Sequence, residues 1–161
     1  MRRDRLTEHW LCEYWSAAEA RWALCDASRG DDLQFDSSNV GRDQFIPAGQ
    51  LWLARRSKST HATTPSSALE QPLANDVLRD LAALNKVEVQ PWHCWGAMCR
   101  PGAPLTDEQR TLFDQLAALT LDPDRSFATL RDCYETDPRV RVPTTVFNSH
   151  YLYERNEPLY G

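Results

Sequence analysis

The chain has 161 residues, of which 42% are hydrophobic and 25% are charged, a composition typical of one soluble globular domain. Its formal net charge of −5 argues against a nucleic-acid or anionic-membrane surface, because both need clustered positive charge. The sequence has no apolar run long enough for a transmembrane helix and no apolar stretch typical of a signal peptide, so we expect a cytoplasmic protein.

The amino-terminal part predicts an antiparallel hairpin. Residues 6–15 are rich in aromatic side chains, as strands are. Residues 16–19 are small or polar and predict a turn, and residues 21–26 predict the returning strand. Residues 27–41 are polar and are expected to form a loop.

The middle of the chain predicts one short helix and a linker. The helix is expected near residues 47–55, because a proline at position 47 suits a first helical turn. Residues 57–67 hold seven serines and threonines and one proline, which predicts a mobile surface segment.

The second half predicts three helices, each beginning at a residue that can cap an amino terminus. Asn75 is the expected first cap, and Thr106 with Gln109 has the spacing of a capping box. Ser126 is the expected third cap, and residues 137–138 (Asp-Pro) end that helix. The apolar residues that recur at helical intervals are Val77, Leu78, Leu81, Leu84, Leu112, Phe113, Leu116, Leu119, Phe127, Leu130 and Tyr134.

A late strand is expected over residues 140–147. The five cysteines are Cys12, Cys25, Cys94, Cys99 and Cys133. An odd number argues against a disulfide framework, and we expect most of them to be small buried hydrophobic residues.

The chemistry of the sequence is concentrated between His9, which begins one predicted strand, and Asp26, which ends the next. A cysteine-dependent acyl transfer needs a histidine that accepts and returns the proton of the thiol. It also needs a carboxylate that holds the imidazole in the right tautomer and orientation. His9 and Asp26 are therefore the candidate catalytic residues.

The register of the hairpin gives a geometric test. If residues 16–19 form the turn, Trp15 pairs with Ala20 and His9 lies opposite Asp26. Directly opposed residues share a face, with Cβ atoms about 4.5–5.5 Å apart, so the two side chains would hydrogen-bond. A slip of one residue would place them on opposite faces. The functional interpretation thus predicts a turn of even length or a compensating bulge.

A structural interpretation of the same residues stays open. One histidine and one aspartate also meet in hairpins that have no catalytic role. The aromatic residues Trp10, Trp15 and Trp22 are expected in the core rather than in contact with a substrate.

The residues His9, Trp10, Glu13, Trp22 and Asp26 resemble the histidine and aspartate motifs of the transglutaminase-like superfamily. That family has a histidine, an aromatic residue and a glutamate a few positions on, and then a tryptophan shortly before the closing aspartate. Further segments resemble one bacterial branch of transglutaminase-like domain proteins, and the resemblance is weak over residues 57–74. These segments are residues 43–48, 78–88, 91–96 and 105–121.

The resemblance implies an α+β protein with a papain-like fold, in which a nucleophilic cysteine begins a helix upstream of the histidine strand. Only eight residues precede His9, and none is a cysteine. We therefore expect a truncated papain-like core in residues 1–56, a mobile linker in residues 57–74, and a helical region in residues 75–161 that packs on the core.

The other cysteines are poor replacements for the nucleophile. Strand alternation points Cys12 away from His9 and Cys25 away from Asp26, and Cys94 lies in an aromatic segment typical of packing. His93, Cys94 and Cys99 lack the paired spacing of a zinc site. We expect no metal and no cofactor.

The function expected from the resemblance is Cys-His-Asp acyl transfer, with His9 as acid and base and Asp26 orienting it. A peptide or protein substrate is expected, with hydrolysis and transamidation both open, and the chain alone is expected to be inactive. The alternatives are a non-catalytic peptide- or protein-binding module and a truncated gene product without function, which the DNA upstream of Met1 would help to separate. Loss of core elements predicts exposed apolar surface on the hairpin and a tendency to associate.

Overall fold

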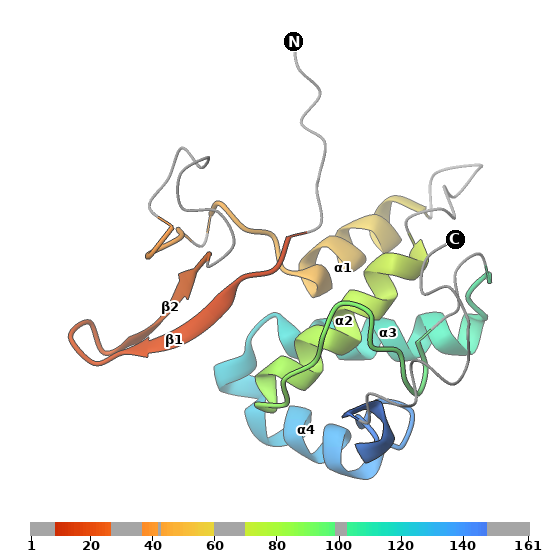
Figure 1. Ribbon diagram of the computed structural model, residues 1–161. Helices are drawn as coiled ribbons and strands as arrows, with labels where there is room; N and C mark the ends of the chain where they lie inside the picture. The colour runs from red at the N-terminus through yellow and green to blue at the C-terminus, as the bar shows by residue number, and fades with distance from the viewer. Residues whose placement is uncertain (1–8, 27–36, 42, 60–69, 99–102, 148–161) are drawn as a thin grey trace. The chain divides into compact units, whose positions relative to one another are not determined.

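The computed structural model describes residues 9–26, 37–41, 43–59, 70–98 and 103–147, and the chain divides into two compact units, Met1–Ile46 and Pro47–Gly161. The first unit contains a two-stranded antiparallel hairpin, and the second contains four α-helices (Figure 1). The predicted α+β class is confirmed. The strands and helices are β1 (Cys12–Ser16), β2 (Arg21–Cys25), α1 (Ala48–Ser59), α2 (Glu70–Leu84), α3 (Asp107–Thr120), α4 (Pro123–Thr136) and the 3₁₀ helix η2 (Thr144–Phe147).

The hairpin has the predicted even-length turn, but its register differs from the predicted one. Ser16 pairs with Arg21, and Trp15 pairs with Trp22 rather than with Ala20. The expected turn over residues 16–19 is therefore wrong by one position, because Ser16 is still a strand residue. Ala20 closes the turn at φ 49°, a left-handed conformation that non-glycine residues adopt uncommonly.

A third segment, within the expected loop of residues 27–41, lies along the outer edge of β2. The Val40 N–H donates to the Leu24 carbonyl at 2.8 Å, and the Asp26 N–H donates to the Ser37 carbonyl at 2.8 Å. The segment over residues 37–40 thus supplies backbone partners that a two-stranded hairpin lacks.

The helical unit follows the predicted periodicity more closely than the predicted boundaries. The capping box of α3 is confirmed, since Gln109 N–H donates to Thr106 Oγ1 and Thr106 N–H donates to Gln109 Oε1. The predicted cap at Asn75 is wrong, because α2 already begins at Glu70 and Asn75 is buried inside it. The predicted cap at Ser126 is also wrong, because Asp122 caps α4.

The predicted late strand over residues 140–147 is absent from the described structure, where this segment forms turns and η2. Val140, Val142 and Val146 are buried against the helical core instead. Their β-branched side chains suit a strand, but burial against helices satisfies the same apolar surface without a partner strand.

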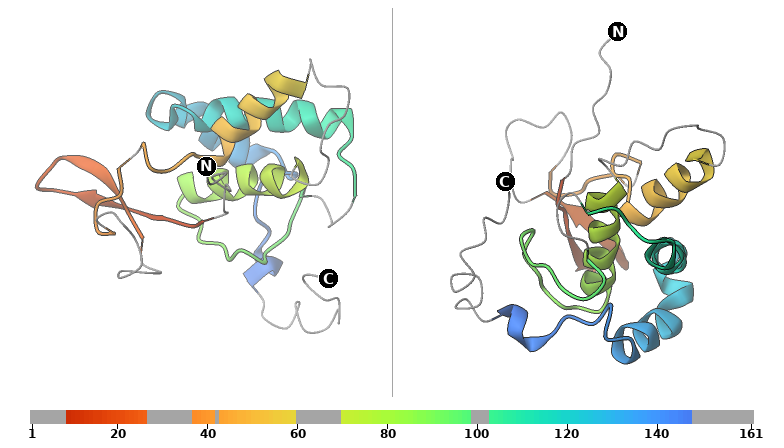
Figure 2. Two further views of the ribbon diagram at one scale, coloured as in Figure 1. Left: turned by 90° about the horizontal axis from the view of Figure 1, so that it is seen from above. Right: turned by 90° about the vertical axis from the view of Figure 1, so that its right-hand side faces the viewer.

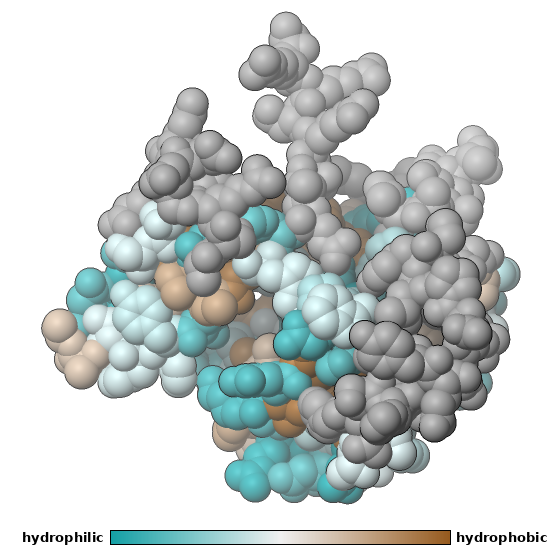
Figure 3. Space-filling model, in the orientation of Figure 1, coloured by the Kyte–Doolittle hydropathy of each residue, from teal (hydrophilic) through white to brown (hydrophobic). Residues whose placement is uncertain are grey.

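The core of the helical unit is formed where α2 packs against α1, α3 and α4 (Figures 1 and 2). Trp52 and Phe113 are fully buried, with ring centroids 5.6 Å apart. The prediction for Phe127 is wrong, since its side chain is exposed. The outward face of α4 is mostly hydrophilic (Figure 3). The predicted core residues that are buried are Val77, Leu78, Leu81, Leu112, Phe113, Leu116, Leu130 and Tyr134.

Polar contacts fix the ends of this core. The indole N–H of Trp52 donates to Asp114 at 2.7 Å, and Arg56 forms an ion pair with the same carboxylate at 3.0 Å. The indole N–H of Trp95 donates to the Val140 carbonyl at 2.9 Å. α1 and α2 extend into both ends of the expected linker, whose residues 60–69 lie outside the described structure. Of the helices described, none combines the length and the apolar character needed to span a membrane.

Candidate functional site

His9 and Asp26, the two predicted catalytic residues, are in direct contact within the first unit. The Nε2 atom of His9 lies 2.6 Å from the Oδ2 atom of Asp26. The Asp26 side chain is completely buried, whereas the His9 side chain is 40% exposed. The pair therefore joins a shielded carboxylate to an imidazole that solutes can reach.

The register explains how the two side chains meet. Cys12 pairs with Cys25, so continuing the ladder by one residue brings Leu11 opposite Asp26. His9 lies two residues further out on the same face, which makes it the diagonal neighbour of Asp26. The predicted direct opposition is wrong, but a shift of two residues keeps both side chains on one face. Diagonal neighbours about 7–8 Å apart at the backbone are within reach of long side chains.

Both the backbone and the side chain of Asp26 form hydrogen bonds. Its N–H donates to the Ser37 carbonyl at 2.8 Å, and Leu24, two residues earlier in the chain, is buried. A buried carboxylate is costly without a hydrogen-bonding partner, so the contact with His9 stabilises the buried end of the hairpin. Sequence reasoning did not find the part played by Ser37, because a polar loop residue gives no signal for a backbone contact.

The contact also decides which nitrogen of His9 is available for chemistry. In the neutral ring, a carboxylate at Nε2 favours the tautomer that carries its proton there and donates it to Asp26. The Nδ1 atom then keeps its lone pair and acts as the proton acceptor. A protonated ring would form an ion pair with Asp26 in the same geometry. The arrangement suits an imidazole that exchanges protons at Nδ1.

Two aromatic residues of the hairpin are more exposed than predicted. Trp15 and Trp22 pack edge to face with centroids 5.8 Å apart. Trp15 is 52% exposed and Trp10 is 38% exposed, so the prediction that both lie in the core is wrong. A pair of short strands has too little apolar surface to bury them.

Two cysteines lie on the hairpin, on the face opposite the pair. Cys12 and Cys25 are direct cross-strand partners, one residue out of phase with His9 and Asp26, as alternation predicts. Burial is the main cause that raises the pKa of Cys25, and the neighbouring Cys12 and Asp26 add to it. Neither thiol is presented to His9.

The exposure of the four described cysteines does not follow the expectation that most cysteines are buried. Cys94 and Cys12 are exposed, and Cys25 and Cys133 are half-buried. Cys94 and Cys133 belong to the helical unit, and burial is the main cause that raises the pKa of Cys133. Cys99 lies outside the described residues.

The other histidine that sequence analysis considered, His93, has a structural role. Its ring is buried, and its Nδ1 atom accepts the Gln90 N–H at 3.1 Å. Burial, followed by the charge of Arg79, lowers the pKa of His93. Within the described ranges, no group of three or more histidine, cysteine or acidic side chains could hold a metal ion.

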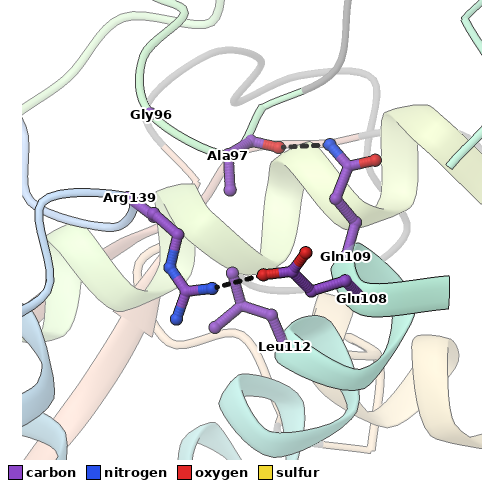
Figure 4. Close-up of a pocket in the computed structure, with 6 residues that line it drawn as sticks. All are labelled: Gly96, Ala97, Glu108, Gln109, Leu112 and Arg139. Atoms are coloured by element: carbon purple, nitrogen blue, oxygen red, sulfur yellow. Dashed lines mark hydrogen bonds and ion pairs between the residues drawn. The ribbon is translucent and has the colours of Figure 1, made fainter. Parts of the chain in front are cut away.

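A pocket of about 260 Å³ lies in the helical unit between the segment around Gly96 and the start of α3 (Figure 4). Arg139 Nη1 lies 3.3 Å from Glu108 Oε1 across this pocket. Arg139 also binds Asp137 and thereby lowers the pKa of that carboxyl. Arg139 is thus shared between two carboxylates at the pocket, which lies in a different unit from His9 and Asp26.

Comparisons with protein-family models, with curated proteins and with solved structures find no match to this chain. The chemistry of His9 and Asp26 and the sequence motif that contains them are therefore the features of this chain that bear on its function.

Proposed function

We propose that this chain is a transglutaminase-like protein whose hairpin supplies the histidine and aspartate of a Cys-His-Asp acyl-transfer site. The observation that carries the proposal is the 2.6 Å contact between His9 Nε2 and the buried Asp26 carboxylate. In this proposal the hairpin is part of a papain-like core. The matching residues around the pair, Trp10, Glu13 and Trp22, add sequence support.

The proposed roles follow from the two nitrogens of the imidazole. His9 Nδ1 takes the proton of a thiol, and the resulting thiolate attacks the carbonyl carbon of an amide. The tetrahedral intermediate breaks its carbon–nitrogen bond, and His9 returns the proton to the leaving amine. The products are an acyl thioester and a free amine. Water or a second amine then attacks the thioester while His9 removes its proton. The carbon–sulfur bond breaks, and the departing thiolate takes that proton back from His9.

Asp26 is the positioning residue in this scheme. It binds Nε2, so it fixes the ring orientation and stabilises the imidazolium that forms when Nδ1 is protonated. Its burial protects it from competing water. The anchoring of its backbone to Ser37 keeps the carboxylate in place on the ring.

The thiol is the group that the described hairpin does not provide. Cys12 and Cys25 lie on the opposite face from His9. We therefore propose that the chain as it stands does not form an acyl-enzyme from an amide, although its imidazole can still assist the second half of the reaction.

That second half gives a positive test. The chain, with its cysteines alkylated to prevent thiol exchange, is mixed with a small peptidyl thioester and a primary amine, and thiol release is followed. General acid–base catalysis contributes about 10²- to 10⁴-fold in complete sites, so we expect a smaller acceleration that depends on His9. His9→Gln should abolish it, and Asp26→Asn should reduce it.

His93→Gln is the matched control, because His93 is a buried histidine of the other unit. Equal thioester cleavage by the parent chain and by His9→Gln would contradict the proposed role of the pair. A thioester formed from an amide donor on any of the five cysteines, located by peptide mapping, would contradict the proposed lack of a nucleophile.

A second candidate function is a non-catalytic module that binds a peptide or protein. It is favoured by the exposed aromatic side chains of Tyr14 and Trp15 on the hairpin, which are 45% and 52% exposed. Aromatic residues of this kind are enriched at interfaces. Under this alternative, Trp15→Ala would remove binding, and His9→Gln would leave both binding and thioester cleavage unchanged.

A further inference from the structure

We propose that Cys12 and Cys25 form a reversible modification site, in which thiol–disulfide exchange with a glutathione-type disulfide joins β1 to β2 through a cross-strand disulfide. The proposal goes beyond the proposed function and does not depend on it. It starts from the register of the hairpin, in which these two cysteines are direct partners.

The backbone geometry brings the two residues to a suitable separation. The Leu24 carbonyl accepts the Val40 N–H and therefore points away from β1. Because backbone groups alternate along a strand, those of Cys25 point towards β1, which makes Cys12 and Cys25 a hydrogen-bonded pair with Cα atoms about 5.5 Å apart. Disulfides span Cα separations of about 4.4–6.8 Å.

The two thiols also differ in a way that sets their order of reaction. Cys12 is exposed, whereas Cys25 is half-buried. Burial raises the pKa of Cys25 most, and the charge of Cys12 and the hydrogen bond between the two thiols raise it further. Cys12 is therefore the entry point, and Cys25 is the resolving thiol.

The disulfide forms in two exchange steps. The Cys12 thiolate attacks one sulfur of the glutathione disulfide, which forms a mixed disulfide and releases one glutathione thiolate. The Cys25 thiolate then attacks the Cys12 sulfur, which forms the intramolecular disulfide and releases the second glutathione. The two protein thiols are oxidised, and one glutathione disulfide is reduced to two glutathiones.

The modification would fix the register of β1 against β2, on which the contact between His9 and Asp26 depends. A bridge between Cys12 and Cys25 excludes any slip of β1 against β2, and such a slip would move His9 and Asp26 to opposite faces. Cys25 directly precedes Asp26 in the chain. The disulfide would therefore hold the register that places the carboxylate beside the imidazole.

The other described cysteines serve as controls. Cys133 lies in α4 and Cys94 lies in an irregular segment, so neither has a cross-strand partner. Cys94 is exposed like Cys12, which makes Cys94→Ser the matched control for a reaction that depends only on access.

The test uses the reduced chain in glutathione buffers with an increasing fraction of the disulfide form, followed by acid quenching, alkylation and mass spectrometry. We expect the parent chain and Cys94→Ser to lose the mass of two hydrogen atoms and to yield a Cys12–Cys25 cross-linked peptide. Cys25→Ser should stop at a mixed disulfide on Cys12. Dithiothreitol should restore all the thiols.

Several outcomes would overturn the proposal. In one such outcome, the parent chain keeps its thiols or accumulates only mixed disulfides. The buffer in that case is one in which Cys12 of the Cys25→Ser variant becomes glutathionylated. Another outcome is a disulfide that joins Cys12 or Cys25 to a different cysteine or to a second chain. Mapping the parent chain decides the second outcome without any variant. In the first outcome, Cys25→Ser serves only to show that Cys12 reacts in the buffer used.

Discussion

The two units of this chain are organised by different physical forces. The helical unit has a core of large side chains that are completely shielded, among them Trp52, Phe113 and Leu78. The hairpin unit leaves Tyr14 and Trp15 exposed, and its candidate site brings a buried carboxylate to 2.6 Å from an imidazole nitrogen. Burial of apolar area therefore stabilises the helices, whereas register decides whether His9 and Asp26 lie on the same face of the hairpin.

The first way to test this comparison is to remove a core ring. Phe113 is fully buried against Trp52, so Phe113→Ala should lower the free energy of unfolding of the helical unit by about 3–5 kcal/mol. Urea unfolding followed by circular dichroism measures this loss. A loss below about 1 kcal/mol, the usual range for surface changes, would mean that the core does not stabilise the unit as described.

The second prediction concerns the loss of stability at low pH. The lowered pKa of His93 means that the unfolded chain binds a proton more readily than the folded chain near the ordinary pKa of about 6.5. Its contribution to stability is therefore present above that pKa and is lost as the pH falls towards the folded pKa. The slope cannot exceed about 1.4 kcal/mol per pH unit for one group. Urea midpoints between pH 8 and pH 5 should fall, and His93→Gln should flatten that fall.

A third, smaller effect tests the capping of α3. Thr106→Ala removes the oxygen that accepts the Gln109 N–H, which should cost about 1 kcal/mol. Thr106→Ser keeps that oxygen and is the control. Equal unfolding midpoints for the Ala and Ser variants would show that the capping box contributes nothing to stability.

The smallest effect is expected on the hairpin. Trp15 is half-exposed and packs edge to face on Trp22, and cross-strand pairs contribute about 0.2–1 kcal/mol. Trp15→Ala should therefore change the unfolding free energy by less than about 1 kcal/mol and leave thioester cleavage by His9 in place. A loss as large as that of Phe113→Ala would contradict the contrast between the two units.

The sequence predicted the parts of the fold that depend on local signals. The apolar periodicity identified the buried faces of α2 and α3. The capping box marked the start of α3 because its partners, Thr106 and Gln109, are only three positions apart. These local signals missed the start of α2, where Glu70 forms an ion pair with Arg110 of α3 at 2.9 Å. That contact joins residues 40 positions apart, and no local pattern reveals it.

The two residues of the candidate site were predictable from the sequence, but the register that joins them was not. Strand patterning placed His9 and Asp26 on one face, and the structure brings them together. Ser16 looked like a turn residue but pairs with Arg21, so the ladder is shifted by two residues. The same shift made Cys12 and Cys25 cross-strand partners. Their spacing in the sequence did not indicate this, because the polar residues around a turn do not specify which two strand residues pair beside the turn.

The measurement that tests the central claim most directly is the tautomer of His9, read from nitrogen-15 chemical shifts of the ring at neutral pH. We predict that the proton of the neutral ring resides on Nε2, bound to Asp26, and that Asp26→Asn lowers this population. His93, whose Nδ1 accepts a backbone N–H, serves as an internal reference of known geometry. A His9 ring that carries its proton on Nδ1, or that is unaffected by Asp26→Asn, would contradict the imidazole–carboxylate pair and the acyl-transfer function proposed for it.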